Sequence, residues 1–239
     1  MTTTPAEDDN SPTSEIESHL APAGAVGHRR SGIPEGAADP FLLIGRRIGA
    51  ASPLFLMGAF SVLWSGIAQS SLQAAWTLAW LIVCLVAAVF FFGVALRTLR
   101  DIRMWRTEHA DLKPSAASET ARRASLRDFS VLFGVQFVLM ASLSVALSLA
   151  GRPDEIPPSL VIIMGAHFVP FAPLFHRRVD YAIGALAVVI GVLGQFAVIT
   201  PWCDPALASS LTCVAASVCT LAYGCYFVAQ LRREESQLA

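Results

Sequence analysis

One segment of the chain combines an ionisable side chain with two prolines inside an apolar stretch. Residues 165–173 have the sequence GAHFVPFAP, in which His167 is followed by Pro170 and Pro173. Each proline lacks an N–H, so the carbonyl four residues earlier loses its helical partner and the helix bends. An imidazole beside such carbonyls is typical of the broken-helix sites of transporters. The pattern predicts a polar substrate site at His167, with a purely structural histidine, hydrogen-bonded to a neighbouring helix, as the alternative.

Two glutamines lie in other apolar stretches and could act together with this histidine. Gln136 and Gln195 are both surrounded by apolar residues in the sequence. A glutamine amide carries both donors and an acceptor, and it can form hydrogen bonds between helices in apolar surroundings. We therefore predict a substrate-binding set that consists of His167, Pro170, Gln136 and Gln195.

The histidine segment also resembles part of a known group of proteins. The pattern G-x-H-F-x-P-x-A, followed by Leu174, Phe175 and a basic turn, is similar to a segment of uncharacterised small multispanning bacterial membrane proteins. The similarity is confined to the neighbourhood of this segment, and it implies no activity. It favours His167 and Pro170 as the marked positions.

Other kinds of chemical site are not indicated. Zinc, di-iron and haem sites need several converging ligands, whereas His167 is the one histidine in an apolar stretch and no carboxylate lies inside one. The five cysteines form no C-x-x-C pair, and P-loop, zincin and G-x-S-x-G motifs are absent. The sequence predicts no cofactor and no metal, and an embedded enzyme is the least favoured functional class.

The candidate residues must be positioned by helices that cross a membrane. Of the 239 residues, 54% are hydrophobic and only 15% are charged, which is too apolar for an ordinary soluble domain. All charged residues lie outside six apolar stretches, each close to the length of about 20 residues that a spanning helix needs. The predicted fold is all-α, a polytopic bundle of six transmembrane helices at residues 48–68, 74–96, 129–150, 159–175, 181–199 and 207–230.

These spans define a transmembrane domain at residues 41–231 with polar segments around it. Residues 1–40 are rich in Thr, Ser, Pro, Gly and Glu, and they are predicted to form a disordered tail. Residues 97–128 are predicted to be a basic cytoplasmic loop between the second and third spans. Residues 232–239 form a second cytoplasmic tail.

The basic residues predict how the bundle is oriented. Of the 17 Lys and Arg residues, all but Arg152 fall on one side of the predicted bundle, and positive charge gathers on the cytoplasmic side. Both termini are therefore predicted to be cytoplasmic. Lys113 is the single lysine, which suggests a G+C-rich bacterial genome and hence the cytoplasmic membrane of a bacterium. Four arginines could bind anionic lipid headgroups or serve only as topological signals: Arg97, Arg100, Arg103 and Arg106.

Small residues recur at helical spacing in the last two predicted spans. Such residues allow close approach of helix backbones. The stripes are predicted to be helix-packing seams, with a lining for a substrate path as the alternative. They comprise Gly184, Gly191, Ala216, Thr220 and Gly224.

Two functional classes fit these features. The first is a small permease or substrate-binding membrane protein whose polar site surrounds His167. The second is a non-catalytic membrane subunit or scaffold that uses its small-residue seams to bind other membrane proteins or a second copy of the chain. A formal net charge of −1 gives no positive field for nucleic acid. A hydrated cavity at His167 would favour the permease, and a sealed histidine would favour the scaffold.

Overall fold

The computed structural model describes residues 40–109, 116–175 and 177–236, and these residues are almost entirely helical, with no strand among them. The helices are α1 (Pro40–Ser71), α2 (Ala75–Glu108), α3 (Ala116–Leu149), the single-turn 3₁₀ helix η1 (Pro153–Glu155), α4 (Ile156–Phe175), α5 (Arg178–Ile199) and α6 (Pro205–Ser236). The predicted disordered tail falls at residues 1–40, of which 1–39 lie outside the described part of the chain.

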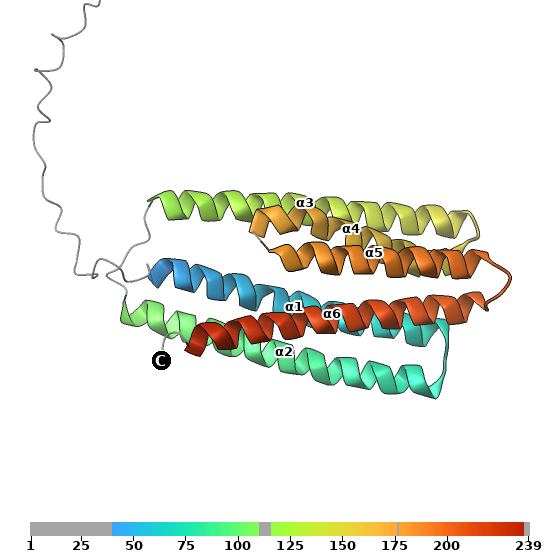
Figure 1. Cartoon of the computed structure of the whole chain (residues 1–239), viewed down its shortest axis with the longest axis horizontal. Coiled ribbons are helices and arrows are strands. Elements are labelled where there is room, and N and C mark those ends of the chain that lie inside the picture. The colour runs from blue at the N-terminus through green and yellow to red at the C-terminus, as the bar shows by residue number, and fades with distance from the viewer. Residues whose placement is uncertain (1–39, 110–115, 176, 237–239) are drawn as a thin grey trace, which may run out of the picture. The chain divides into compact units, whose positions relative to one another are not determined.

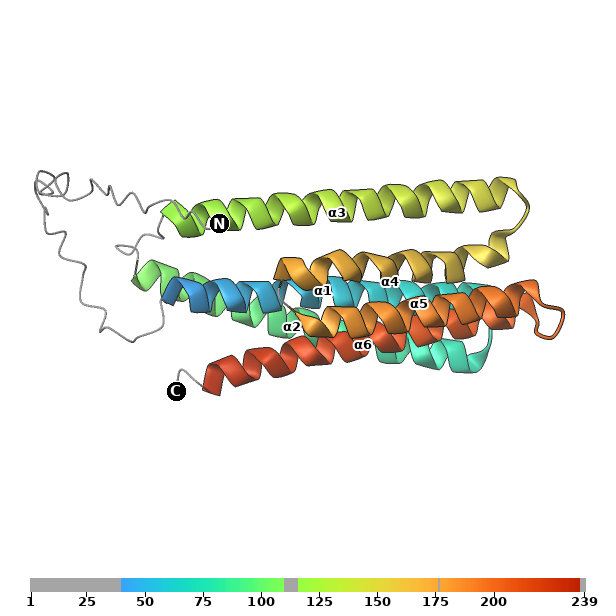
Figure 2. The ribbon, with the colours of Figure 1, turned by 45° about the horizontal axis from the view of Figure 1, so that its top comes forward.

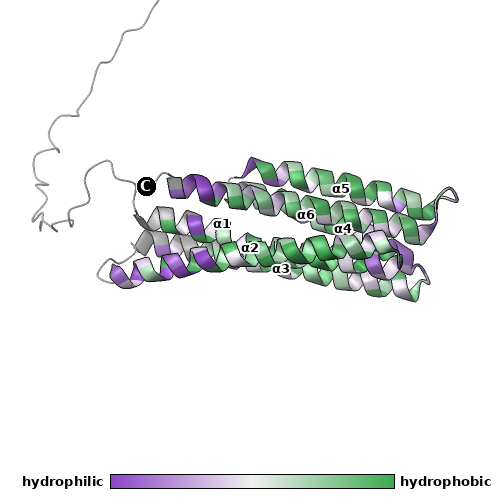
Figure 3. Cartoon of the chain, turned by 90° about the horizontal axis from the view of Figure 1, so that it is seen from below, coloured by the Kyte–Doolittle hydropathy of each residue, from purple (hydrophilic) through white to green (hydrophobic). Residues whose placement is uncertain are grey.

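The six α-helices of the described residues are all long and apolar enough to cross a membrane. Hydrophobic residues make up their middle parts, and hydrophilic residues gather near the end of the bundle where α2 and α6 terminate (Figure 3). A helix satisfies its own backbone hydrogen bonds, which is the requirement that hydrocarbon imposes on a spanning segment. The predicted all-α fold with six candidate spans is therefore confirmed.

The helices extend beyond the apolar stretches from which the spans were predicted. α2 continues through the four loop arginines to Glu108, and α3 begins at Ala116, so helix occupies much of the predicted basic loop at residues 97–128. The physical reason is that hydropathy marks the part of a helix that fits the hydrocarbon, whereas the helix itself ends only where a breaking residue or a lost hydrogen bond stops it.

The helices form a bundle in which α6 has a central place (Figure 1). α1 packs against both α2 and α6, and α4 packs against α5, while α4 and α5 each also contact α6. α3 lies at the periphery, where it contacts α4 and η1 (Figure 2). The large side chains of Trp64, Phe91 and Phe227 are wholly buried between α1, α2 and α6.

α4 and α5 touch at their backbones because three glycines lie at the contact. A Cβ atom on Gly165 would lie 2.7 Å from the carbonyl oxygen of Gly184, and one on Gly184 would lie 2.8 Å from the carbonyl oxygen of Gly165. Further along, a Cβ atom on Gly191 would lie 2.8 Å from the amide nitrogen of Ile162 and 2.8 Å from the carbonyl oxygen of Pro158. Only residues without a side chain permit this approach.

The small residues of α6 also face the inside of the bundle. Ala216 and Thr220 are buried, and Gly224 lies directly against the ring of Phe91 in α2. The predicted stripes on α5 and α6 are thus occupied by other helices of the same chain.

Replacing Gly191 by Leu should destabilise the protein, because the added side chain collides with the backbone of α4. Overpacking of this kind costs about 1–3 kcal/mol, and thermal unfolding of the purified protein in detergent measures it. Val189→Leu is the matched control, since Val189 lies on the same helix and is 53% exposed. Equal melting temperatures for the two variants would contradict the close contact of α4 and α5.

Candidate functional site

A buried carboxylate lies where α5 meets α6. Asp180 is only 1% exposed, although it belongs to the first turn of α5. The hydroxyl of Tyr223 in α6 donates a hydrogen bond to the carboxylate. The amide dipoles at the start of α5 also favour a negative charge at this position. Asp180 is therefore removed from water, which is costly for a carboxylate, but it is not left without a partner.

Arg177, just before α5, places a positive charge beside this carboxylate. Its backbone carbonyl accepts a hydrogen bond of 3.2 Å from the N–H of Asp180, and its Nη2 donates a hydrogen bond of 2.9 Å to the backbone carbonyl of Gly49 in α1. The guanidinium lies over the rings of Phe175 and Phe227, 4.9 Å from each centroid. Arg177 thus connects the turn between α4 and α5 with α1 and α6.

His167 lies against two aromatic rings of its own helix, one of which contacts Tyr223. Its imidazole lies 4.5 Å from the ring of Phe168 and 4.9 Å from that of Phe171, measured between centroids. Phe168 in turn makes an edge-on contact of 5.5 Å with Tyr223. The Nδ1–H of His167 donates to the backbone carbonyl of Met164. This hydrogen bond stays within α4, so it does not tie the histidine to a neighbouring helix.

We call the group around the buried carboxylate the Asp180 site. Its side chains come from α4, α5, α6 and the residue that precedes α5. The Asp180 site consists of Phe168, Phe175, Arg177, Asp180, Tyr223 and Phe227, with His167 at its edge.

The two glutamines predicted to act with His167 form hydrogen bonds with other residues. Gln136 in α3 is 2% exposed; its Nε2 lies 3.6 Å from the sulfur of Met140, and its Oε1 has no hydrogen-bond partner among the described residues. Gln195 lies near the far end of α5 and bonds to Glu155. In the described structure no hydrogen bond joins His167 to either glutamine.

Pro170 lines a groove between α3 and α4, with a volume of about 520 Å³. The groove is apolar except for one carboxylate at its rim. It is lined by Asp128, Val131, Leu132, Pro170, Pro173 and Leu174. Of the predicted substrate-binding residues, Pro170 belongs to this groove.

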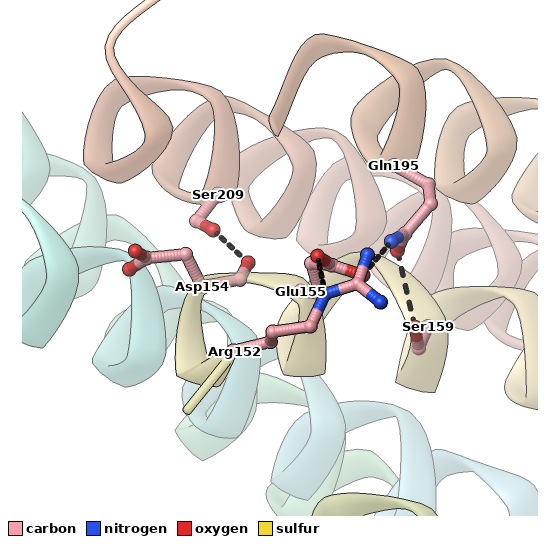
Figure 4. Close-up of polar contacts among 6 residues, drawn as sticks. All are labelled: Arg152, Asp154, Glu155, Ser159, Gln195 and Ser209. Carbon is pink, nitrogen blue, oxygen red and sulfur yellow. Dashed lines mark hydrogen bonds and ion pairs between the residues drawn. The ribbon is translucent and has the colours of Figure 1, made fainter. Parts of the chain in front are cut away.

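A second polar group holds the opposite end of the α4–α5 pair (Figure 4). Glu155, which is 8% exposed, accepts a hydrogen bond of 2.5 Å from Nε of Arg152 and one of 2.6 Å from Nε2 of Gln195. The hydroxyl of Ser159 donates to Oε1 of Gln195 over 3.1 Å. We call these four residues the Glu155 network. Both carboxylate oxygens of Glu155 have a donor, so the charge is compensated within the network.

α6 is fastened to this end by hydroxyl groups. Ser209 donates to the backbone carbonyl of Asp154 over 2.7 Å (Figure 4), and Ser210 donates to the carbonyl of Ala68 in α1 over 3.0 Å. The α4–α5 pair is therefore joined to α6 by polar contacts at both of its ends.

Asp180, Glu155 and Tyr223 are not among the site residues predicted from the sequence. The two carboxylates lie next to apolar stretches, so they were counted with the charges outside the spans. The sequence pattern that could have predicted the pair is an acidic residue at the border of one apolar helix and a tyrosine inside another. Such residues can form a hydrogen bond where the two helices pack together.

Among the described residues, no group of three His, Cys, Asp or Glu side chains lies close enough together to hold a metal ion. Comparison with known protein families, with curated proteins and with solved structures gives no match to this chain. The chemical interpretation of the two polar groups therefore rests on their geometry.

Replacing Glu155 by Ala should lower the melting temperature in detergent, because it leaves the half-buried amide of Gln195 without its acceptor. The expected loss is about 1–3 kcal/mol. Asp128→Asn is the control, since the 3.3 Å contact of Asp128 with Arg127 is exposed and such surface pairs contribute little. A melting temperature that Glu155→Ala leaves unchanged would show that the network does not hold α4 to α5.

Proposed function

We propose that this chain is a small permease or substrate-binding protein of the cytoplasmic membrane of a bacterium, with its substrate site around His167 and Asp180. One observation carries the proposal: the carboxylate of Asp180 is 1% exposed inside a bundle of apolar helices. Ionisable side chains in such surroundings are costly, and they mark substrate or ion pathways in membrane proteins.

The helices around Asp180 support the same proposal, since Tyr223 contacts the carboxylate directly and His167 is joined to Tyr223 through Phe168. His167 comes from α4, Asp180 from α5 and Tyr223 from α6, so the site lies where three helices converge, as substrate sites of helical transporters do. The sequence resemblance of the histidine segment favours His167 and Pro170 as well. Gln136, with its unpartnered amide oxygen, is a further candidate to contact substrate, whereas Gln195 is engaged by Glu155.

We also propose that both termini are cytoplasmic. The exposed side chains of the four arginines at the end of α2 lie at the same end of the bundle as the start of α5 and the end of α6 (Figure 1). Arg152 lies at the opposite end. By the positive-inside rule this places the Asp180 site toward the cytoplasm and the Glu155 network toward the outside. The arginines of α2 are then placed to meet anionic headgroups.

Reporter fusions test this orientation. A reporter fused after Gln73, Pro153 or Asp204 should lie outside the cytoplasm. A reporter fused after Glu108, Arg177 or Glu235 should lie in the cytoplasm. The reason is the strong bias of basic residues to one side. A cytoplasmic signal at Asp204 would contradict the assignment of α5 and α6 as two spans.

The second candidate function is a non-catalytic membrane subunit or scaffold. The seams predicted to bind partners are occupied within the chain, since Gly184 and Gly191 lie against α4. The observation that favours a scaffold is the periphery of α3, where apolar side chains such as Val131, Val135 and Val138 are exposed. In a bilayer, lipid or another membrane protein covers such a surface equally well.

Access of water to His167 distinguishes the two candidates. In a background without the five native cysteines, a His167→Cys variant of a permease should react with a charged thiol reagent added to inside-out vesicles, because thiolate chemistry needs water. Val189→Cys, on the exposed side of α5, is the control that should stay unmodified in lipid. A folded His167→Cys protein that does not react would favour the scaffold.

A further inference from the structure

The guanidinium of Arg177 is held in the manner of a bound cation. It lies over the rings of Phe175 and Phe227 at 4.9 Å from each centroid, and its residue adjoins the buried Asp180, whose backbone N–H donates to the carbonyl of Arg177. Proteins recognise organic ammonium groups by the same combination of aromatic faces and negative charge. The structure therefore shows a cation site that is filled by a side chain of the chain itself.

We propose that the Asp180 site binds a lipophilic monovalent cation, which displaces the guanidinium of Arg177 from the rings of Phe175 and Phe227. The proposal names the substrate class of the permease suggested above and rests on that function. The carboxylate of Asp180 pairs with the positive charge of the ligand, and the surrounding aromatic rings contact the apolar groups of the ligand.

The negative charge of Asp180 favours a cationic ligand over an anionic one. The hydroxyl of Tyr223 is the hydrogen-bond donor to Asp180, so the carboxylate still needs a positive charge nearby. When an organic cation takes the place of the guanidinium, this charge balance is kept. An anion would meet the carboxylate at close range with no positive charge left to offset the repulsion.

Arg177 can leave the site because of where it stands in the chain. It precedes the first residue of α5 at the end of the bundle, and its side chain is only partly buried. A long arginine side chain at a helix end can turn toward the interface and keep its charge in water. The hydrogen bond from its guanidinium to the carbonyl of Gly49 is one that water can replace.

The surroundings favour a lipophilic ligand. Aromatic contacts run from Tyr223 through Phe168 and Phe171 to Phe129 of α3, with centroid separations of 5.5, 6.4 and 5.5 Å. Phe129 follows Asp128, which lines the groove between α3 and α4. A cation dissolved in the bilayer would thus meet a carboxylate at the groove and a continuous set of rings leading to Asp180.

Binding of tetraphenylphosphonium to the purified full-length protein in detergent tests the proposal, with tetraphenylborate as the anion of the same shape. We expect tetraphenylphosphonium to bind and tetraphenylborate not to bind. Arg177→Gln should tighten cation binding by about tenfold, because an internal competitor that fills the site reduces apparent affinity by the fraction of free site. Asp180→Asn should weaken it by about tenfold or more, and Asp180→Glu should retain it.

A folding defect would weaken binding in every variant, whereas Asp180→Glu should retain binding and Arg177→Gln should increase it. Glu108→Gln, at an exposed carboxylate of α2, controls for the removal of an acidic residue and should leave binding unchanged. Equal binding of both ions, or unchanged cation affinity in Arg177→Gln and Asp180→Asn, would overturn the proposal. If cation binding fails while His167→Cys still reacts with the aqueous reagent, the cation class is wrong and the permease stands. If both fail, the permease is wrong as well.

Discussion

The backbone contact between α4 and α5 determines where both polar groups of this protein lie. Gly184 lies against α4, so Asp180, one turn earlier on the same face of α5, is directed into the bundle. At the other end of the contact Gly191 lies against α4, and one turn later Gln195 reaches Glu155. A side chain on either glycine would separate the helices and with them both sets of polar partners.

The two groups differ in how their charge is compensated. Glu155 receives hydrogen bonds from a guanidinium and an amide within its own network, which suits a fixed connection between helices. Asp180 receives one from a hydroxyl, while the nearby guanidinium is engaged with aromatic rings and with a backbone carbonyl of α1. Buried charges are destabilising unless they are fully paired, so the carboxylate of Asp180, with fewer donors than that of Glu155, is the one at which we propose a ligand.

The contacts of Arg177 couple the proposed site to the rest of the bundle. The same guanidinium that lies over Phe227 of α6 is bonded to Gly49 of α1. A ligand that displaces it would therefore loosen the contact between the α4–α5 turn and α1. At the opposite end, Ser209 and Ser210 would still hold α6 to Asp154 and to α1. Differential contacts of this kind are what a ligand needs to shift a helical bundle between two arrangements.

The sequence by itself determined the all-α fold and six candidate spans, because span length and backbone self-satisfaction are local properties of each segment. It also identified His167, Gln136 and Gln195 as polar side chains within apolar stretches. Only the tertiary structure decided which side chains meet, since that depends on how each helix is rotated about its axis and on which helices touch. Asp180 lies at a helix end, where hydropathy alone does not distinguish a charge facing water from one turned toward Tyr223 in the core.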